Sequence, residues 1–426
     1  MVVTSLRKTV RDDKREVILD EASAQFNEYG FHDVRLEDIA DALGAKKASI
    51  SYHFQSKAAL LAAAYARSCD YLDRVLREAA ENSDGLNQAG SWIRSVARMH
   101  SSALTNDGPQ LAILNDLDAL GDGKREEIEA RIALQLDHIE RFLANAAGTP
   151  PPRGAVLLLW TLPGWIEMWL SAVPARRHGL QIEALAKLLE KGIARLGEPL
   201  PLASLPLSGD GASMLFNREE RARLKRDAFE RAGIRRFNKQ GYGGFSLNAL
   251  ADELGVSRGT FYYTFADKDA LLEAAAKRSH ARILAVLEAV GKAPGPALPN
   301  IAGGLVTLYS EHTSNLEPML RGCIYKSLPT ARGAVADAEW QGIAARLASL
   351  LAECAEQGGC SDHGVDKLEL ILLAALRNIA VSSGLSGFPG GNPFNSANAA
   401  DYFALFTLGL MQQPTGHVPG ASELPA

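Results

Sequence analysis

The sequence predicts an all-α protein, on three observations. Apolar residues recur at three- and four-residue steps, as at Val17, Ile18, Ala22 and Phe26, while the alternating runs of β-branched residues typical of strands are missing. The chain has 426 residues, more than one ordinary core holds. A stretch near residue 43 also returns near residue 254. These observations indicate at least two helical domains built from a repeated unit.

The repeat is ungapped over some forty positions. It reads LGAKKASISYHFQSKAALL at residues 43–61 and LGVSRGTFYYTFADKDALL at residues 254–272. An offset of 211 positions carries Gly30 onto Gly241 and holds through both copies. Such self-similarity indicates one structural unit used twice.

Each copy is predicted to form a helix-turn-helix. An amphipathic helix ends near Gly30 or Gly241, a short helix follows, and Gly44 or Gly255 stands where that helix must stop. Glycine enters the left-handed conformation of a helix C-terminus without steric cost. A second short helix begins three residues later, and in this motif the second helix lies in the DNA major groove.

The residues after the turn are small, polar and aromatic, which suits contacts to base edges and phosphates. Ser257 stands at the N-cap of the second copy's recognition helix. Lys57 and Lys268 fall in the first turn of the next helix, where a lysine beside a helix N-terminus is expected to clamp a phosphate. The candidate DNA contacts are Arg35, Lys46, Lys47, Ser49, Ser51, Tyr52, His53, Lys57, Ser246, Ser257, Arg258, Gly259, Thr260, Tyr262, Tyr263 and Lys268.

In this combination the motifs resemble the DNA-binding domain of TetR-family (tetracycline-repressor-like) transcriptional regulators, over residues 14–61 and 225–272. The resemblance implies that each helix-turn-helix is followed by a helical ligand-binding and dimerisation domain. It also implies a repressor that binds double-stranded operator DNA and releases it on binding a small molecule. Repression rather than activation comes from the resemblance alone.

Two such units in one chain predict an intramolecular pseudo-dimer. Its recognition helices would reach adjacent major grooves about 34 Å apart. Its internal interface is expected between residues 155–173 with 181–196 and residues 366–384 with 398–411. The expected organisation is 1–61 first helix-turn-helix domain, 62–197 first helical domain, 198–217 linker, 218–272 second helix-turn-helix domain, 273–413 second helical domain and 414–426 disordered tail.

The two copies differ at positions that matter for DNA reading. Lys46 stands opposite the capping Ser257, Arg35 opposite Ser246, and Ser51 opposite Tyr262, where the family commonly places a phosphate-contacting tyrosine. The first copy is expected to lose about 1 kcal/mol per missing cap and to gain cations. We therefore expect an asymmetric operator.

Charge alone does not identify a partner, because the formal net charge is −5. Local basic stretches at residues 7–15 and 218–239 nevertheless lie beside the two motifs and predict salt-sensitive DNA binding.

The helical domains carry candidate contacts for a small apolar or aromatic effector. Trp160, Trp165 and Trp169 are spaced for one broad helical face, together with upstream residues, although such a stripe more often forms core or dimer interface. The candidates are Trp92, His100, Trp160, Trp165, Trp169, Tyr309 and His312.

Other chemistries find little support. Cys354, Cys360 and His363 lack the spacing of a metal site, and no catalytic motif is present, so no metal, cofactor or enzymatic role is expected. The apolar run 155–173 carries Pro163, Gly164 and Glu167, which disfavours a membrane span. Four cysteines and no leader predict a reducing cytoplasm. A DNA-binding regulator or activator without an effector remains the alternative, and a helical enzyme the weaker one. Further association of the pseudo-dimer is left open.

Overall fold

The computed structural model describes residues 2–81, 85–147, 150–151, 153–171, 173–191, 218–328 and 330–357, with residues 373, 376 and 379. Some side chains within these ranges, including those of residues 2–13 and Trp165, are not described. The expected linker at 198–217, the tail and most of the expected interface segments at 366–384 and 398–411 lie outside the described residues. Every regular element within the described ranges is helical, so the predicted all-α class is confirmed.

The first half of the chain runs from α1 to α8. Its helix-turn-helix domain comprises α1 (Val2–Tyr29), α2 (Leu36–Ala42) and α3 (Lys47–His53). The first helical domain comprises α4 (Lys57–Ala80), α5 (Gly85–Leu104), α6 (Asp122–Ala147), α7 (Arg153–Ser171) and α8 (His178–Lys191), with short 3-10 turns η1 (Leu117–Ala119) and η2 (Ala175–Arg177).

The second half repeats this order over its described residues. Its helix-turn-helix domain comprises α9 (Arg218–Gly244), α10 (Leu247–Glu253) and α11 (Arg258–Thr264). The helical domain that follows comprises α12 (Lys268–Lys292), α13 (Ala297–Thr313), the 3-10 turn η3 (Gly322–Ser327) and α14 (Thr330–Glu356).

The apolar periodicity of the sequence becomes the buried face of these helices. In the first helix-turn-helix domain Leu19, Ile39 and Ile50 are completely buried, as is Leu60 of the adjoining α4. In the second the core is aromatic, and the ring centroids of Phe229 and Phe261 lie 5.2 Å apart. Each such side chain contributes about 1.5–3 kcal/mol when it is fully buried.

One asparagine in each half ties the first helix to the helical domain. The Asn27 amide donates to the carbonyl of Leu111 (2.9 Å), and its oxygen accepts from the N–H of Ile113 (2.8 Å). Asn238 makes the same pair of bonds to the Met319 carbonyl (2.8 Å) and the Arg321 N–H (2.9 Å). We call these pairs the asparagine clamps. They fix the segment after α5 to α1 and the segment after α13 to α9.

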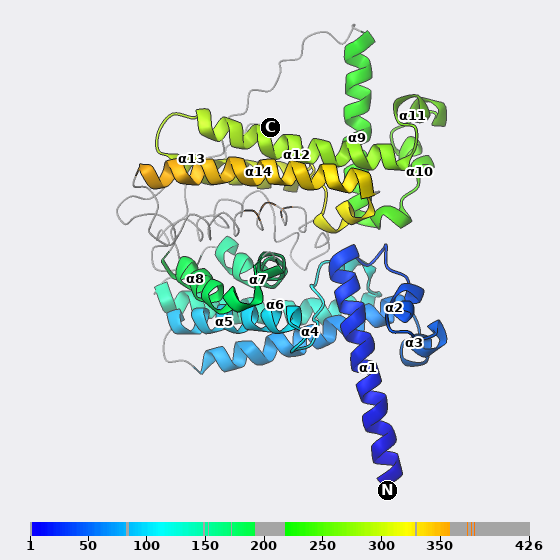
Figure 1. Ribbon diagram of the computed structural model, residues 1–426, viewed down its shortest axis with the longest axis vertical. Helices are drawn as coiled ribbons and strands as arrows, with labels where there is room; N and C mark the ends of the chain where they lie inside the picture. Colours follow the sequence, from blue (N-terminus) through cyan, green and yellow to red (C-terminus); the bar gives the residue numbers. More distant parts are fainter. Residues whose placement is uncertain are drawn as a thin grey trace.

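The two halves lie against each other, and both helix-turn-helix domains face the same edge of the molecule (Figure 1). In this view α2 and α3 lie below α10 and α11 at the right, while the far ends of α1 and α9 point in opposite directions. The halves meet where α1 packs against η3. Neither recognition helix is therefore turned toward the interior.

Candidate nucleic-acid interface

The turn between α2 and α3 forms as the sequence predicts. Gly44 adopts a φ of +60°, which favours glycine, and Gly255 adopts +63° in the second copy. The apolar side of each recognition helix is buried through Ile50 or Phe261, and Phe54 or Phe265 follows it into the core. Each recognition helix is therefore held by its inner side and leaves its outer face to solvent.

The outer faces of α3 and α11 carry the predicted DNA contacts. Tyr52 and Tyr263, which are equivalent in the repeat, are 68% and 87% exposed, and Tyr262 is 54% exposed. The other residues of these faces are also exposed, apart from the half-buried His53 and Thr260: Lys46, Lys47, Ser49, Ser51, Ser257, Arg258 and Gly259. Aromatic rings stand in water here among hydroxyl groups and cations.

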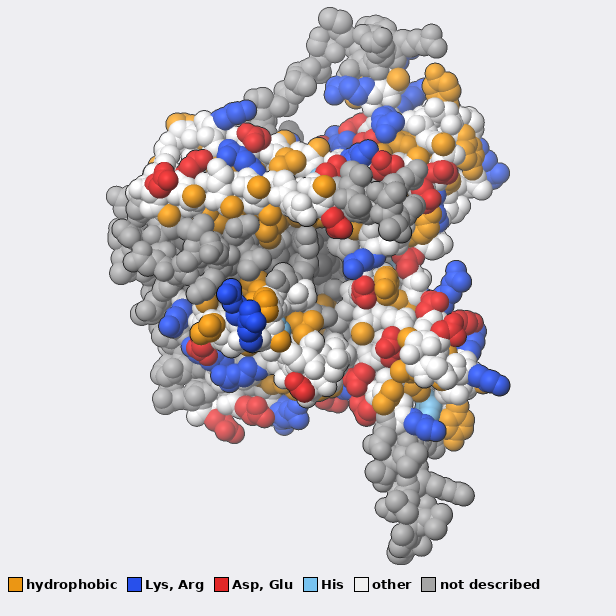
Figure 2. Space-filling view, viewed as in Figure 1, with side chains coloured by type: hydrophobic (Ala, Val, Ile, Leu, Met, Phe, Trp, Pro, Cys, Tyr) orange, Lys and Arg blue, Asp and Glu red, His pale blue; other side chains and the backbone are white. Residues whose placement is uncertain are grey.

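Cations and carboxylates both stand along this edge (Figure 2). The Lys47 ammonium pairs with Glu37 at 2.7 Å, and this contact lowers the pKa of the Glu37 carboxyl. A phosphate that binds Lys47 would have to compete with Glu37. In the basic stretch of α9, Arg231 pairs with Asp227 (3.0 Å) and Arg236 pairs with Glu253 (2.6 Å). The local excess of positive charge is thus smaller than the sequence alone suggests.

Lys57 and Lys268 differ from the predicted phosphate clamps, because their ammonium groups donate to backbone carbonyls of their own domain. The Lys57 ammonium donates to the carbonyls of Phe31 (2.7 Å) and Val34 (2.8 Å) and lies 4.2 Å from the centre of the Phe31 ring. Lys268 repeats this at the carbonyls of Tyr242 (2.6 Å) and Phe245 (3.2 Å). Burial lowers the pKa of both ammonium groups. Both lysines face back to the segment that joins the first two helices of their domain, where they donate to its backbone carbonyls.

The helix caps differ from expectation at one of the two positions. The Ser257 hydroxyl accepts from the N–H of Thr260 (3.2 Å), whereas Lys46 provides no side-chain cap, as predicted. Ser246, however, makes no side-chain cap bond. In the first copy Asp38 accepts from the Arg35 N–H at 2.8 Å, so a carboxylate three residues along satisfies that donor instead. The first copy therefore does not lose a cap at Arg35.

Sequence reasoning missed Glu37, Asp38 and Asp33. The capping role of Asp38 could have been found from its position three residues after Arg35. Glu37 meets Lys47 only after the turn has formed. Asp33 contacts backbone N–H groups in the other half of the chain, 209 and 210 positions away, which no local pattern reveals.

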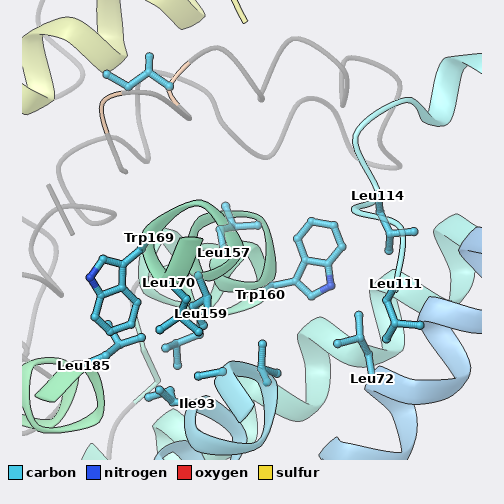
Figure 3. Close-up of a cluster of buried hydrophobic side chains, with 14 of the residues drawn as sticks. Leu72, Ile93, Leu111, Leu114, Leu157, Leu159, Trp160, Trp169, Leu170 and Leu185 are labelled. Atoms are coloured by element: carbon cyan, nitrogen blue, oxygen red, sulfur yellow. The ribbon is translucent and has the colours of Figure 1, made fainter. Parts of the chain in front are cut away.

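The effector candidates of the first half are buried in a shared apolar cluster. Trp160 and Trp169 leave α7 on opposite sides, and Trp169 lies beside Leu185 (Figure 3). The expectation of one face is therefore wrong for this pair, because nine residues at about 100° each amount to half a turn. The Trp92 indole donates to the Leu159 carbonyl (3.3 Å), and Trp160 donates to Gln135 (3.1 Å). The Trp165 side chain lies outside the described residues.

The remaining effector candidates are equally enclosed. His100, Tyr309 and His312 are each less than 5% exposed. His312 accepts from the Met319 N–H at 2.9 Å, and burial lowers its pKa to about 4. Its ring is neutral at pH 7 and holds the segment after α13.

Comparison with known proteins shows which families and proteins the chain resembles. The family model described as "Bacterial regulatory proteins, tetR family" matches residues 18–64 and again residues 231–275. The chain carries two copies of the tetR-family domain in tandem. Both matched segments cover the helix-turn-helix described above, so the predicted repeat of a tetR-family DNA-binding domain is confirmed.

TetR-family relatives match one short stretch each. The HTH-type transcriptional regulator RutR of Escherichia coli (strain K12) is 33% identical over 91 residues, which cover 21% of this chain and 43% of RutR. The biofilm operon icaADBC HTH-type negative transcriptional regulator IcaR of Staphylococcus aureus (strain Newman) is 36% identical over 62 residues, 15% of this chain and 33% of IcaR. The chain thus spans less than half the length of these curated relatives.

A solved TetR-family transcriptional regulator from Bordetella parapertussis 12822 also matches, with a TM-score of 0.34 and 19% identity, over 41% of this chain and 92% of that chain.

Among the described helices, α7 included, none has the length and apolar character needed to cross a membrane. No group of three or more metal-ligating side chains comes together within the described residues, and Cys360 and His363 lie outside them.

Proposed function

We propose that the protein is a DNA-binding transcriptional regulator that inserts α3 and α11 into two major grooves of one operator. The observation that carries the proposal is the placement of both recognition helices on one edge of a single chain, with their polar faces exposed (Figure 1). The names of RutR and IcaR, both HTH-type regulators, support the same activity. We further infer that the chain acts as an intramolecular pseudo-dimer.

The operator that fits this protein is asymmetric. α11 presents Arg258 and Tyr262, whereas α3 presents Lys47 and Ser51 at the same repeat positions. Arginine reads guanine edges in a bidentate manner, while lysine acts as a point charge. Lys47 is also paired with Glu37, which weakens its availability further. The two helices would therefore prefer different half-sites.

The test is a selection of bound fragments from random double-stranded DNA, followed by footprinting. Arg258→Ala and Lys46→Ala each remove one exposed cation, and each should reduce the salt slope of binding by about 1. The matched control is Arg98→Ala, whose side chain is 65% exposed on α5, away from this edge. Arg258→Ala and Lys46→Ala should weaken the footprint over different half-sites, and Arg98→Ala should weaken it over neither. A palindromic footprint with equal effects of both variants would exclude the asymmetric operator, and failure to bind any fragment would exclude DNA binding.

We propose that DNA binding responds to a small apolar or aromatic effector in the first helical domain. A chain of direct contacts supports this. α7 passes so close to the segment after α5 that a Cβ on Gly164 would lie 3.3 Å from the Ile113 side chain. The N–H of Ile113 donates to Asn27 on α1. A shift of α7 would therefore move α1, the helix α2 that packs on α1, and the recognition helix α3 that packs on α2.

Release of DNA on effector binding would make the protein a repressor. The relative IcaR is likewise named a negative transcriptional regulator. The test is a thermal-shift screen of apolar and aromatic compounds, because a ligand at 100 times its Kd stabilises the folded state by about 2.7 kcal/mol. A hit should also weaken operator binding, and Gly164→Ala should reduce that coupling. The absence of any hit, with operator binding intact, would favour a regulator without a small-molecule effector.

A further inference from the structure

The two helix-turn-helix domains touch each other directly. One oxygen of the Asp33 carboxylate, in the loop after α1, accepts from the N–H of Tyr242 at 2.8 Å, and the other accepts from the N–H of Gly243. Both donors lie at the end of α9 in the other half. A carboxylate held by two backbone N–H groups is a strong, directional contact. It joins the loop before α2 to the C-terminal end of α9.

The backbones approach closely at this contact. Gly241 adopts φ +68° and ψ 175°, and a Cβ at this position would lie 2.6 Å from the Cβ of His32. That conformation is essentially restricted to glycine. On the symmetric side, a Cβ on Gly30 would lie 3.3 Å from the sulfur of Cys323 on η3. Little room is left for one domain to slide past the other.

A buried ion pair lies at the same junction. The Asp116 carboxylate accepts from Arg321 of the second half (2.8 Å) and from the N–H of Phe31 (3.1 Å). Asp116 and Arg321 are 8% and 5% exposed. Burial by itself would raise the pKa of Asp116, but Arg321 holds it below its ordinary value. Arg321 also donates to the Asn238 carbonyl (3.3 Å), so the pair connects the ends of α1 and α9.

The charges complement each other only between unlike halves. The asparagine clamps set Ile113 equivalent to Arg321, and in that register Asp116 is equivalent to Ile324. The repeat likewise sets Asp33 against Gly244, which has no side chain. Two first halves would bury Asp116 against an isoleucine, and two second halves would bury Arg321 in the same way. An unpaired buried charge is strongly destabilising.

We propose that the contacts of Asp33 and the Asp116–Arg321 pair form a joint that fixes the distance between α3 and α11, and so makes the protein select operators by the spacing of their half-sites. This inference rests on the proposed DNA binding. One added base pair moves a half-site by about 3.4 Å and rotates it by about 34°, since a helical turn of 10–10.5 base pairs spans about 34–36 Å. A fixed pair of helices cannot follow that displacement without strain.

The spacing test uses the full chain and a series of selected operators whose half-sites are moved apart or together by one base pair. The unaltered protein should lose about tenfold or more in affinity at either step, which corresponds to about 1.4 kcal/mol. Asp33→Ala should flatten this preference to about threefold or less, whereas Asp33→Asn, which keeps one acceptor, should retain part of it. The control is Asp41→Ala, which removes an exposed carboxylate of α2 in the same domain.

A second measurement needs no DNA. The exposed equivalent tyrosines at positions 52 and 263 are replaced by p-acetylphenylalanine and spin-labelled. Double electron–electron resonance between the two labels then reports the distance between α3 and α11. The distribution should be narrow in the unaltered protein and in Asp41→Ala, and broader in Asp33→Ala. Equal widths in all three, or a spacing preference unchanged by Asp33→Ala, would overturn the joint. Failure to bind any operator, with a narrow distribution that Asp33→Ala broadens, would instead overturn only the proposed DNA binding.

Discussion

Replacing Asp116 by leucine tests whether the two halves pack as described. The partner Arg321 is 5% exposed, so the variant leaves a buried guanidinium without its carboxylate. Breaking a buried ion pair in this way costs about 3–5 kcal/mol of the free energy of unfolding. Arg321→Met should cost a similar amount, because it leaves the Asp116 carboxylate with the single N–H of Phe31.

The double variant gives the decisive comparison. Asp116→Leu with Arg321→Met removes both charges and fills their volume with apolar groups, a replacement that is often close to neutral. The losses of the two single variants should therefore add up to about 6 kcal/mol or more beyond the loss of the double variant. Urea unfolding followed by far-ultraviolet circular dichroism at pH 7 measures each free energy.

The control is Asp118→Asn, which breaks a partly exposed pair with Arg125 (3.0 Å) and should cost less than about 1 kcal/mol. Single variants at Asp116 and Arg321 that cost no more than this control, or losses that simply add in the double variant, would refute the buried pair.

Three further predictions concern single residues. Lys57→Met removes three donations to carbonyls and should lower the free energy of unfolding by about 1–3 kcal/mol, while leaving the salt slope of DNA binding unchanged; a slope reduced by about 1 would instead support a phosphate contact by Lys57. Burial lowers the pKa of His312 to about 4, below its value in the unfolded chain. The contribution of His312 to the free energy of unfolding is therefore fully present above pH 6.5, and it is lost as the pH falls and the unfolded state takes up the proton. Urea unfolding should therefore show the unaltered protein losing about 2 kcal/mol more than His312→Asn between pH 7 and pH 5, and parallel losses would exclude this role. Ser257→Ala should cost about 1 kcal/mol in thermal or urea unfolding, but Ser246→Ala should stay within about 0.5 kcal/mol, and equal costs would contradict the difference in capping.

The helix-turn-helix domains could be predicted because their signals are local. Gly44, Gly255 and the buried positions of each short helix follow from spacing within a few residues. The capping by Ser257 belongs to the same class. Repetition of the pattern then excluded coincidence, and the family match covers both copies.

The lysines and tryptophans show where this reasoning stops. A lysine in the first turn of a helix can reach outward to a phosphate or back to the preceding loop, and the loop carbonyls that hold Lys57 have no signature in the sequence. For Trp160 and Trp169 the spacing was available and implied opposite faces, as the structure has them. The expectation of one face was an error of period rather than a lack of information.

The contacts between halves required the fold. Asp116 and Arg321 are 205 positions apart in the chain, and neither belongs to a recognisable motif. The one clue in the sequence is the divergence of the repeat, where Asp33 stands opposite Gly244. Divergence at an otherwise repeated position marks places where the two copies have taken different partners.

With α3 and α11 in one chain, the proposed DNA binding has a further consequence, for how the occupancy of an operator depends on the amount of protein. A regulator assembled from two separate subunits must first associate, so at low copy number its active fraction falls with dilution. Here the Asp116–Arg321 contact is intramolecular and exists at any dilution. Occupancy should then rise with the first power of the protein concentration.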